Sequence, residues 1–318
     1  MRKIFKVIVV FFILLAILGG YYTFKQKATN SGAAQTITVV DSVGRSVVIP
    51  EKPQRVIILN PSNIEIYYAA GGTTIAKPLS TSYNAELKEK LASLPETGII
   101  HSPNLEKILS LQPDLIIGTD VPYHHAIIPP LEAAGIPILI NSINSYEDVL
   151  RTLDLFGQLA GTESSAQQKK EAVMAEYKKV QTAAQNKQPP RSLIIFGAPN
   201  SFSMATKKSF SGNLVESLGG GNIADEVSDS YDAYVSLSME YVTRKDPEVI
   251  FVITMGDADK AIESLRRDLR ENPIWHDISA VRNNRIYQLP ANLFTVNPGT
   301  QLAEAMTILS SYMYRGDE

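Results

Sequence analysis

The chain has 318 residues, 44% of them hydrophobic, and 30 basic against 33 acidic side chains, for a net charge of −3. A chain of this length can bury a sizeable core and usually forms two domains. The charge provides no basic field, which argues against a nucleic-acid partner. The absence of cysteine excludes a disulfide framework, a thiolate metal site, a cysteine nucleophile and a lipid-modified cysteine at the N-terminus.

The N-terminal segment is predicted to direct the rest of the chain out of the cytoplasm. Arg2, Lys3 and Lys6 precede residues 7–24, an uncharged and mostly apolar run that is just long enough to span a membrane. We therefore predict a membrane anchor in residues 1–24, with its N-terminus in the cytoplasm because positive charge stays inside.

A cleaved signal segment is the alternative, and Ser31-Gly32-Ala33 is its better cleavage site. Residues 25–35 are small and polar, and we expect them to form a flexible linker. In either case the folded part is expected on the extracytoplasmic face of the membrane, or secreted or periplasmic after cleavage.

Strand patterns begin directly after the linker. Residues 36–40 and 45–49 are β-rich runs on either side of a turn, which predicts a hairpin. Residues 55–59 (RVIIL) and 114–118 (DLIIG) are continuous apolar runs, typical of strands that are buried on both faces of a parallel sheet.

Helices are predicted to follow these strands. Ser62-Asn63 can cap a helix that ends at Gly71, and Ser102-Pro103 can supply the cap and first residue of a helix that runs to Leu111. Three more elements are predicted, namely a helix over 129–134, a strand over 137–140 and a helix over 145–160. This alternation of strands and helices favours an α/β fold.

Residues 163–186 are predicted to form one long helix, because they lack Gly and Pro and consist largely of good helix formers. Thr162 can cap its start, and Pro189-Pro190 prevent its continuation. One stripe recurs with helical period, made of Ala166, Val173, Tyr177, Val180 and Ala184. We predict that this helix joins two doubly wound α/β lobes with a ligand cleft between them. The predicted division is an N-terminal lobe over 36–145, connecting helices over 146–188 and a C-terminal lobe over 189–318.

The two halves contain an internal repeat. Residues 105–117 (LEKILSLQPDLII) resemble residues 239–251 (MEYVTRKDPEVIF) at a constant offset of 134, which pairs Glu106 with Glu240. The lobes are therefore predicted to be two copies of one unit.

In open α/β sheets ligands bind beyond the carboxyl ends of the strands. The segments expected there are 60–63, 80–84, 101, 120–125, 198–204, 229–234, 255–257 and 294–298. These segments are rich in aromatic and hydroxyl side chains and poor in carboxylates. Such a lining suits a large, partly apolar ligand better than a sugar or a bare cation.

Three segments carry a family resemblance, namely RVIILNPSNIEIYYAAGG, PNLEKILSLQPDLII and IWHDISAVRNNRIYQL. Together with two lobes joined by one helix, they resemble the substrate-binding proteins of ABC importers for iron complexes, haem and cobalamin. The resemblance covers roughly residues 36–314. It implies lobes that barely bend, a monomeric binding protein rather than an enzyme, and an ABC permease dimer with its cytoplasmic ATPase as partners.

Two further segments, SLIIFGAPNSFSMATKKSFSGNLVESLGG and NPIWHDISAVRNNRIYQLPANLF, are similar to the haem receptors of Gram-positive surface haem-uptake systems. In those receptors a Met and a His bind the haem iron from opposite faces. The matching positions here are His101 and Met255, so the two ligand types have exchanged lobes. The resemblance thus implies haem as the transported ligand, with axial His/Met ligation.

The residues alone leave simpler roles open for both positions. His101 precedes a predicted helix start, where a polar residue is ordinary, and Met255 at a strand end is often a core residue. His124 and His125 are adjacent, and on an extended segment they would point in opposite directions. Only one of them can then line the cleft, and His124 is retained as the candidate.

Further residues are assigned to the ligand or to the permease. Candidates for the haem propionates are Asn63, Ser62, Tyr83, Lys207, Lys208 and Ser211. Candidates for packing on the porphyrin are Tyr123, Phe202, Tyr231, Tyr234 and Phe294. The resemblance also implies that Glu106 and Glu240, one on each lobe, dock onto arginines of the permease.

Other functions remain as alternatives. A receptor for a ferric siderophore or cobalamin would share the fold and the partners. A chelatase-like enzyme is an alternative of another class, although the sequence has no G-x-S-x-G, P-loop or dinucleotide motif. A zinc or manganese receptor normally needs several converging His and carboxylate ligands, and this chain has four His in all.

Overall fold

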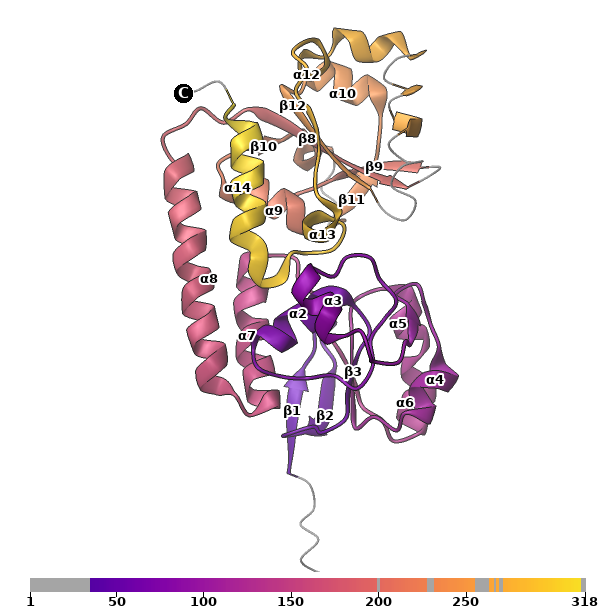
Figure 1. Ribbon diagram of the computed structural model, residues 1–318. Helices are drawn as coiled ribbons and strands as arrows, with labels where there is room; N and C mark the ends of the chain where they lie inside the picture. Colours follow the sequence, from indigo (N-terminus) through magenta and orange to yellow (C-terminus); the bar gives the residue numbers. More distant parts are fainter. Residues whose placement is uncertain are drawn as a thin grey trace, which may run out of the picture.

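The computed structural model describes residues 35–198, 201–227, 232–254, 263–265, 267–268 and 271–315. Two α/β lobes lie one above the other, and the long helix α8 (Glu163–Ala184) runs alongside both (Figure 1). The lobe formed by the earlier residues is called the N-lobe and the other the C-lobe. The predicted anchor lies outside the described residues. Within the described ranges, no helix is long and apolar enough to cross a membrane.

The N-lobe is built on a three-stranded parallel sheet in the order β3–β6–β7. The strands are β3 (Val56–Ile58), β6 (Leu115–Gly118) and β7 (Ile138–Ile140). All their residues are buried, as their continuous apolar runs predict. The predicted antiparallel hairpin is confirmed, with strands β1 (Thr36–Val40) and β2 (Ser46–Pro50). A second, shorter hairpin is formed by β4 (Gly98–Ile99) and β5 (Ser102–Pro103).

The helices of the N-lobe are α2 (Pro61–Ala69), α3 (Ala85–Lys90), α4 (Leu105–Ser110), α5 (Pro122–Ala126), α6 (Ile128–Ala133) and α7 (Tyr146–Ala160). Helix α7 agrees with its prediction at both ends. The hydroxyl of Ser145 accepts the N–H of Asp148 at 3.2 Å, and Gly161 ends the helix in the left-handed conformation.

The predicted start of α4 is wrong. Ser102 and Pro103 form strand β5 instead of opening a helix, because they pair with β4. The helix begins after Asn104, whose side chain accepts the N–H of Lys107 at 2.9 Å. Asn104, closer to the helix, therefore takes the capping role that was predicted for Ser102.

The C-lobe contains a six-stranded mixed sheet in the order β11–β9–β8–β12–β13, with β10 paired to β8. The strands are β8 (Arg191–Ala198), β9 (Ser201–Ala205), β10 (Gly221–Asn222), β11 (Tyr234–Ser236), β12 (Val249–Thr254) and β13 (Ile286–Gln288). Strands β8, β10, β12 and β13 are parallel, whereas β9 is antiparallel to both of its neighbours.

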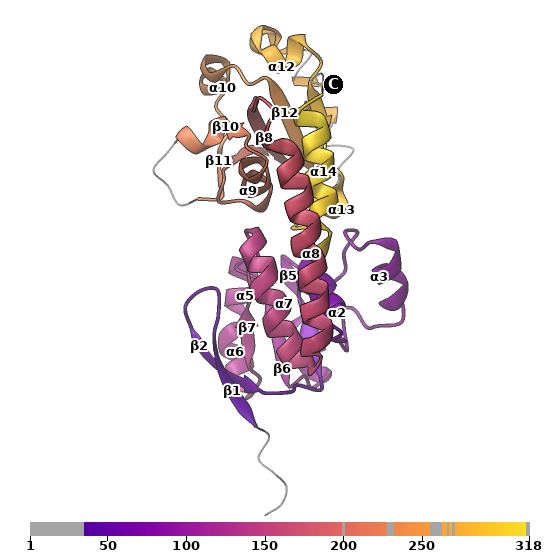
Figure 2. The same cartoon turned by 90° about the vertical axis from the view of Figure 1, so that its left-hand side faces the viewer.

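The α-helices of the C-lobe are α9 (Phe210–Ser217), α10 (Met239–Lys245), α12 (Ser279–Arg282), α13 (Ala291–Phe294) and α14 (Leu302–Met313). Three short 3₁₀ helices are also described, η1 (Ile223–Glu226), η2 (Pro273–Asp277) and η3 (Gly299–Gln301). Helix α14 packs along α8, and α7 packs against the same helix from the N-lobe (Figure 2).

The buried stripe predicted for α8 is present. Ala166, Val173, Tyr177 and Ala184 are buried and Val180 is partly buried. Helix α7 approaches closely, because a Cβ on Gly157 would lie 2.4 Å from the Cβ of Ala166. The stripe belongs to one hydrophobic cluster that continues into both lobes. The predicted cap role of Thr162 is wrong, because its hydroxyl donates to the carbonyl of Ala70 in the N-lobe instead.

The internal repeat is visible in the backbone. Gln112 and Asp246, which the offset of 134 pairs, both have positive φ, at 48° and 43°. The guanidinium of Arg55 donates to the carbonyl of Gln112 at 2.9 Å, and that of Arg191 donates to the carbonyl of Asp246 at 3.0 Å. The same turn is therefore held in the same way in both lobes.

Candidate functional site

The candidate residues come from segments near the boundary between the lobes. Helix α5 and strand β5 lie in the part of the N-lobe nearest to the C-lobe, and α9 and β11 lie in the facing part of the C-lobe (Figure 2). Met255 directly follows β12, and Tyr231 lies shortly before β11. Both lie outside the described residues, so their predicted roles stay predictions.

His101 and Tyr123 are brought together from separate segments. His101 lies exposed in the turn between β4 and β5. Its ring centroid is 5.5 Å from that of Tyr123 on α5, and the ring planes meet at 70°. This edge-to-face contact is a favourable arrangement of two aromatic rings. Since Tyr123 is itself 50% exposed, the pair forms an accessible aromatic surface with an imidazole at its edge.

Two exposed aliphatic residues beside His101 were not predicted. Ile99 is 46% exposed and Leu79 is 54% exposed, and the N–H of Leu79 donates to the carbonyl of Gly98 at 2.8 Å. Exposed apolar side chains on the hairpin that carries an accessible imidazole, and on the segment bonded to that hairpin, suit a flat apolar ligand. Their exposure could not be predicted, because short irregular segments have no periodicity from which exposure could be read.

His124 is fully buried, and its predicted place on the cleft surface is wrong. It lies in helix α5 rather than on an extended segment, and α5 turns its side chain into the N-lobe. Its Nδ1 accepts the backbone N–H of Thr119 at 2.9 Å, which places the proton of the neutral ring on Nε2. Within the described residues, Nε2 has no hydrogen-bond partner. Burial lowers the pKa of His124 to about 4, so the ring is neutral at physiological pH.

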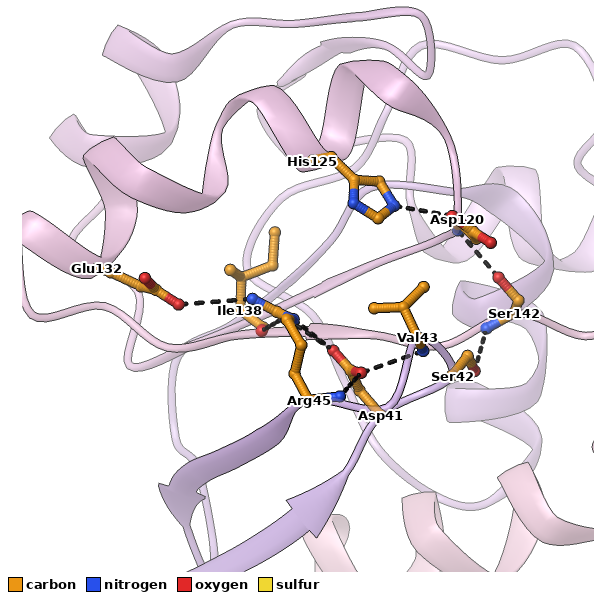
Figure 3. Close-up of polar contacts among 9 residues, drawn as sticks. All are labelled: Asp41, Ser42, Val43, Arg45, Asp120, His125, Glu132, Ile138 and Ser142. Atoms are coloured by element: carbon orange, nitrogen blue, oxygen red, sulfur yellow. Dashed lines mark hydrogen bonds and ion pairs between the residues drawn. The ribbon is translucent and has the colours of Figure 1, made fainter.

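His125 begins a chain of polar contacts that fixes α5 from outside. Its Nε2 lies 2.8 Å from Oδ1 of Asp120. The backbone N–H of Asp120 donates to the hydroxyl of Ser142 at 2.9 Å, and the N–H of Ser142 donates to the hydroxyl of Ser42 at 2.8 Å (Figure 3). The loop before Tyr123 is thereby tied to the turn of the β1–β2 hairpin.

The hairpin turn is itself held by Arg45. Its guanidinium forms an ion pair with Asp41 at 2.8 Å, donates to the carbonyl of Ile138 at 2.8 Å and reaches Glu132 at 3.4 Å (Figure 3). These contacts join the hairpin to β7 and α6. The hairpin is therefore part of the N-lobe framework that positions the β6–α5 loop.

Asn63 was predicted to contact the ligand, and the structure contradicts this. Helix α2 begins at Pro61, so Asn63 lies inside the helix rather than at its cap. Its side chain is fully buried, and its amide group donates to Asn60 Oδ1 at 2.8 Å, to the carbonyl of Asn141 at 2.9 Å and to that of Gly118 at 3.2 Å. It joins the ends of the N-lobe strands and presents no donor to a ligand.

Ser62 and Tyr83 line a small pocket between the lobes, with a cavity volume of about 20 Å³. The Ser62 hydroxyl donates across the boundary to the carbonyl of Asn297 at 2.9 Å. The Tyr83 hydroxyl donates to the carbonyl of Pro78 at 2.8 Å. Both hydroxyl protons are thus already engaged, and as arranged neither group can donate to a carboxylate.

The predicted aromatic residues of the C-lobe differ in exposure. Tyr234 on β11 is 47% exposed, and its ring centroid lies 5.0 Å from that of Phe196. Phe202 on β9 is partly buried, with its ring against Gly197. Phe294 is 3% exposed and belongs to the core, so its predicted contact with the ligand is wrong. Its helix, α13, turns this face inward because it packs on α14 and β12.

Glu106 and Glu240 occupy equivalent positions in the two lobes. Each lies exposed in the first turn of a helix, α4 or α10. Asn104 caps the first helix and Ser238 caps the second. An acidic residue there also interacts favourably with the helix dipole, but neither carboxylate is needed as the cap.

Among the described residues, no group of three or more His, Asp or Glu side chains could hold a metal ion. An iron ion that is already held by a chelator needs fewer protein ligands, because the chelator fills its equatorial positions. One or two axial donors, such as an accessible imidazole, are then sufficient.

Comparison with known proteins identifies the class. A family model described as periplasmic binding protein matches residues 56–293. The chain is 27% identical over 296 residues to an uncharacterized ABC transporter substrate-binding lipoprotein, YvrC, of Bacillus subtilis, covering 91% of this chain and 88% of that protein. It is 25% identical over 242 residues to the high-affinity heme uptake system protein IsdE of Staphylococcus aureus, covering 76% of this chain and 80% of that protein.

Solved structures share the fold. The structure of S. aureus IsdE complexed with heme matches with a TM-score of 0.73 and 22% identity, over 82% of this chain and 99% of that one. The catecholate-siderophore binding protein VctP of Vibrio cholerae matches with a TM-score of 0.69 and 19% identity, over 87% of this chain and 99% of that one. The two-lobed fold is therefore common to proteins that bind different iron complexes.

The family match spans most of the chain, and the chain belongs to the periplasmic binding protein family. It is a substrate-binding protein of an ABC transporter, of the class that serves iron complexes. Members of this class are binding proteins, which act together with a membrane permease and its ATPase.

The buried neutral state of His124 predicts a loss of stability in acid. Since its pKa is lowered from 6.5 to about 4, the unfolded chain binds this proton more tightly than the folded chain. The neutral His124 ring contributes about 3 kcal/mol to the free energy of unfolding. This contribution is full above about pH 6.5 and is lost as the pH falls toward 4. In His124→Asn, whose side-chain oxygen can still accept the N–H of Thr119, this part of the pH dependence should disappear. Urea denaturation of both proteins between about pH 4 and pH 7 measures it; parallel profiles would show that His124 does not titrate in this way.

Proposed function

We propose that this protein is the extracytoplasmic haem receptor of an ABC importer and holds the iron porphyrin between its lobes. The observation that supports this most directly is the accessible imidazole of His101, in edge-to-face contact with Tyr123 and beside the exposed side chain of Ile99. Such a surface offers both an axial nitrogen ligand for iron and an apolar wall for the flat ring.

In this proposal His101 supplies one axial ligand from the N-lobe and Met255 the other from the C-lobe. The fully buried strand β12 leads directly to Met255 and ends at Thr254, whose carbonyl accepts the hydroxyl proton of Thr295 at 3.0 Å. The last described residue before Met255 is therefore firmly fixed. Tyr123 and Tyr234, both about half exposed, are proposed to contact the two faces of the porphyrin.

Ser62 and Tyr83 are proposed to meet the polar edge of the ligand through their oxygen lone pairs or through bridging water, since both hydroxyl protons are engaged. Phe202 and Tyr231 remain proposed contacts of the C-lobe. A ferric siderophore is the alternative cargo, because VctP shares the fold and its name states that it binds such compounds. Cobalamin would be accommodated by the same architecture.

Haem binding can be tested with the fragment of residues 36–318 and added haemin. We expect the visible spectrum of a six-coordinate, low-spin haem. His101→Ala and Met255→Ala should each change this spectrum and weaken haemin binding roughly tenfold or more, the equivalent of about 1.4 kcal/mol for one lost axial bond.

His276→Ala is the matched control, because His276 is exposed in η2 of the C-lobe and has no proposed role. An unchanged spectrum in both ligand variants would reject the His/Met assignment even if haemin binds. Binding of a ferric siderophore or cobalamin in place of haemin would support the alternative cargo, and insertion of metal into free porphyrin would indicate a chelatase.

Glu106 and Glu240 are proposed to dock onto the permease, one from each lobe, since both are exposed at equivalent positions. Replacing either residue by Ala should slow uptake of the bound cargo several-fold, and replacing both should slow it further, without changing haemin affinity. Uptake by cells that depend on this importer measures the effect. Glu89→Ala, which removes an exposed carboxylate from α3, should transport normally; an equal loss in this control would argue against specific docking.

Membrane anchoring by residues 1–24 is likewise proposed from the charge and apolar pattern of that segment. The full chain should remain in the membrane fraction after washing with high salt or alkaline carbonate, whereas a chain without residues 1–35 should be released. Recovery of a shortened mature chain in the soluble extracytoplasmic fraction would instead establish cleavage.

A further inference from the structure

A set of side-chain hydrogen bonds joins the lobes on one side of their boundary. Ser62 donates to the carbonyl of Asn297, whose own amide donates to the carbonyl of Ile143 at 3.3 Å. The amide of Asn84 donates to the side chain of Gln301 at 3.1 Å. These contacts connect α2, α3 and the segment before α7 with the segment that leads through η3 into α14.

Glu65 occupies the middle of this set. From α2, its Oε2 accepts the backbone N–H of Thr300 at 2.8 Å, and its Oε1 accepts the hydroxyl proton of Thr300 at 2.6 Å. A Cβ on Gly299, which has a φ of +56°, would lie 1.9 Å from Oε2. The carboxyl group of the N-lobe therefore rests directly on the backbone of the C-lobe, at a position that only glycine can occupy.

Glu65 differs from the other members of the set because it can ionise. None of the ion pairs found in the described ranges includes it. The charged groups that act on it are Lys169 of α8 and, with opposite effect, Glu86 of α3. Of the other elements packed on α2, β3 and η3 contain no ionisable residue, and α7 brings Phe156 against Tyr67.

We propose that the contact between Glu65 and Thr300 is a proton-linked latch between the lobes. As a carboxylate, Glu65 accepts both Thr300 protons. With a neutral carboxyl group the hydroxyl bond reverses, so that Oε1–H donates to the Thr300 hydroxyl while Oε2 still accepts the Thr300 N–H, and both hydrogen bonds persist without a charge in the lobe boundary. Loss of the proton leaves a carboxylate in the lobe boundary with no cation in contact, which weakens the junction. The proton thus controls how firmly the lobes are held together, whichever iron complex occupies the cleft.

The direction of the pKa shift of Glu65 is set by burial, against the two hydrogen bonds from Thr300. Burial raises the pKa of Glu65 above its usual value of 4.5, and Glu86 adds to the increase, whereas Thr300 and Lys169 oppose it. A raised pKa in the folded state means that the folded chain binds the proton more tightly than the unfolded chain. The stabilisation from this contact is therefore full below the pKa that Glu65 has in the unfolded chain. It is lost as the pH rises through the pKa that Glu65 has in the folded chain.

Glu65→Gln separates the proton from the contact, because the Gln amide can donate to the Thr300 hydroxyl and its oxygen can accept the Thr300 N–H at every pH. Glu65→Ala removes both hydrogen bonds. The full chain, which has no native cysteine, can carry a spin label in each lobe through Ser110→Cys and Asn283→Cys, both at exposed positions. Pulsed electron resonance in detergent then reports the distribution of the interlobe distance between about pH 5 and pH 9.

We expect the wild-type distribution to broaden as the pH rises, that of Glu65→Gln to stay narrow and that of Glu65→Ala to be broad throughout. The unfolding midpoint of Glu65→Gln should match the wild type at about pH 5 and exceed it by about 2 °C or more at about pH 9. Ser62→Ala, which removes a lobe contact without an ionisable group, should lower the midpoint equally at both pH values. The proposal is overturned if Glu65→Ala keeps the wild-type distribution, or if wild type and Glu65→Gln behave alike at every pH.

Discussion

The packing of α8 against both lobes is the constraint on which the rest of the structure depends. Its buried stripe continues a single hydrophobic cluster from the N-lobe into the C-lobe, so the helix is part of both cores. Against α7 the approach is close enough that Gly157 faces Ala166 without room for another methyl group. A connection of this kind resists bending, because tilting one lobe would break packed contacts along the whole helix rather than rotate a few backbone bonds. Two lobes joined in this way therefore keep nearly the same relative positions before and after any ligand binds between them.

The elements with strong periodicity were predictable from the sequence, and their packing was as well. The stripe of α8, the doubly buried strands β3 and β6 and the β1–β2 hairpin all follow from the spacing of apolar residues. The repeat was predictable for the same reason, and the shared positive φ of Gln112 and Asp246 shows that it extends to the backbone. The secondary-structure predictions that failed concerned single residues at the starts of helices. At α4 the sequence offered two adjacent candidates for the cap, and pairing between β4 and β5 decided in favour of Asn104.

The site was less predictable, because membership of a cleft depends on which way short segments turn. Asn63, His124 and Phe294 were predicted to reach the cleft from their positions in the sequence, yet each side chain is buried. Their polar or aromatic character has structural uses that compete with ligand binding: Asn63 and His124 satisfy backbone groups at the ends of strands, and Phe294 fills the core. His101 and Tyr123 lie on segments that leave their rings exposed, and their meeting across 22 positions of sequence required the fold.

The polar contacts between the lobes and the aromatic surface around His101 have complementary roles. Polar groups such as Ser62, Asn84 and Glu65 are satisfied by partners in the other lobe, so this side of the boundary is already closed by hydrogen bonds. The surface of His101, Tyr123 and Ile99 has instead an exposed, largely apolar character. Because one side of the boundary is closed by the protein's own side chains, the other side, with its apolar area and the accessible imidazole of His101, is the one left available to the proposed ligand. Closure on the first side holds the two lobes at a fixed separation, which would suit the rigid, planar cargo proposed above, since no large conformational change would be needed to bind it.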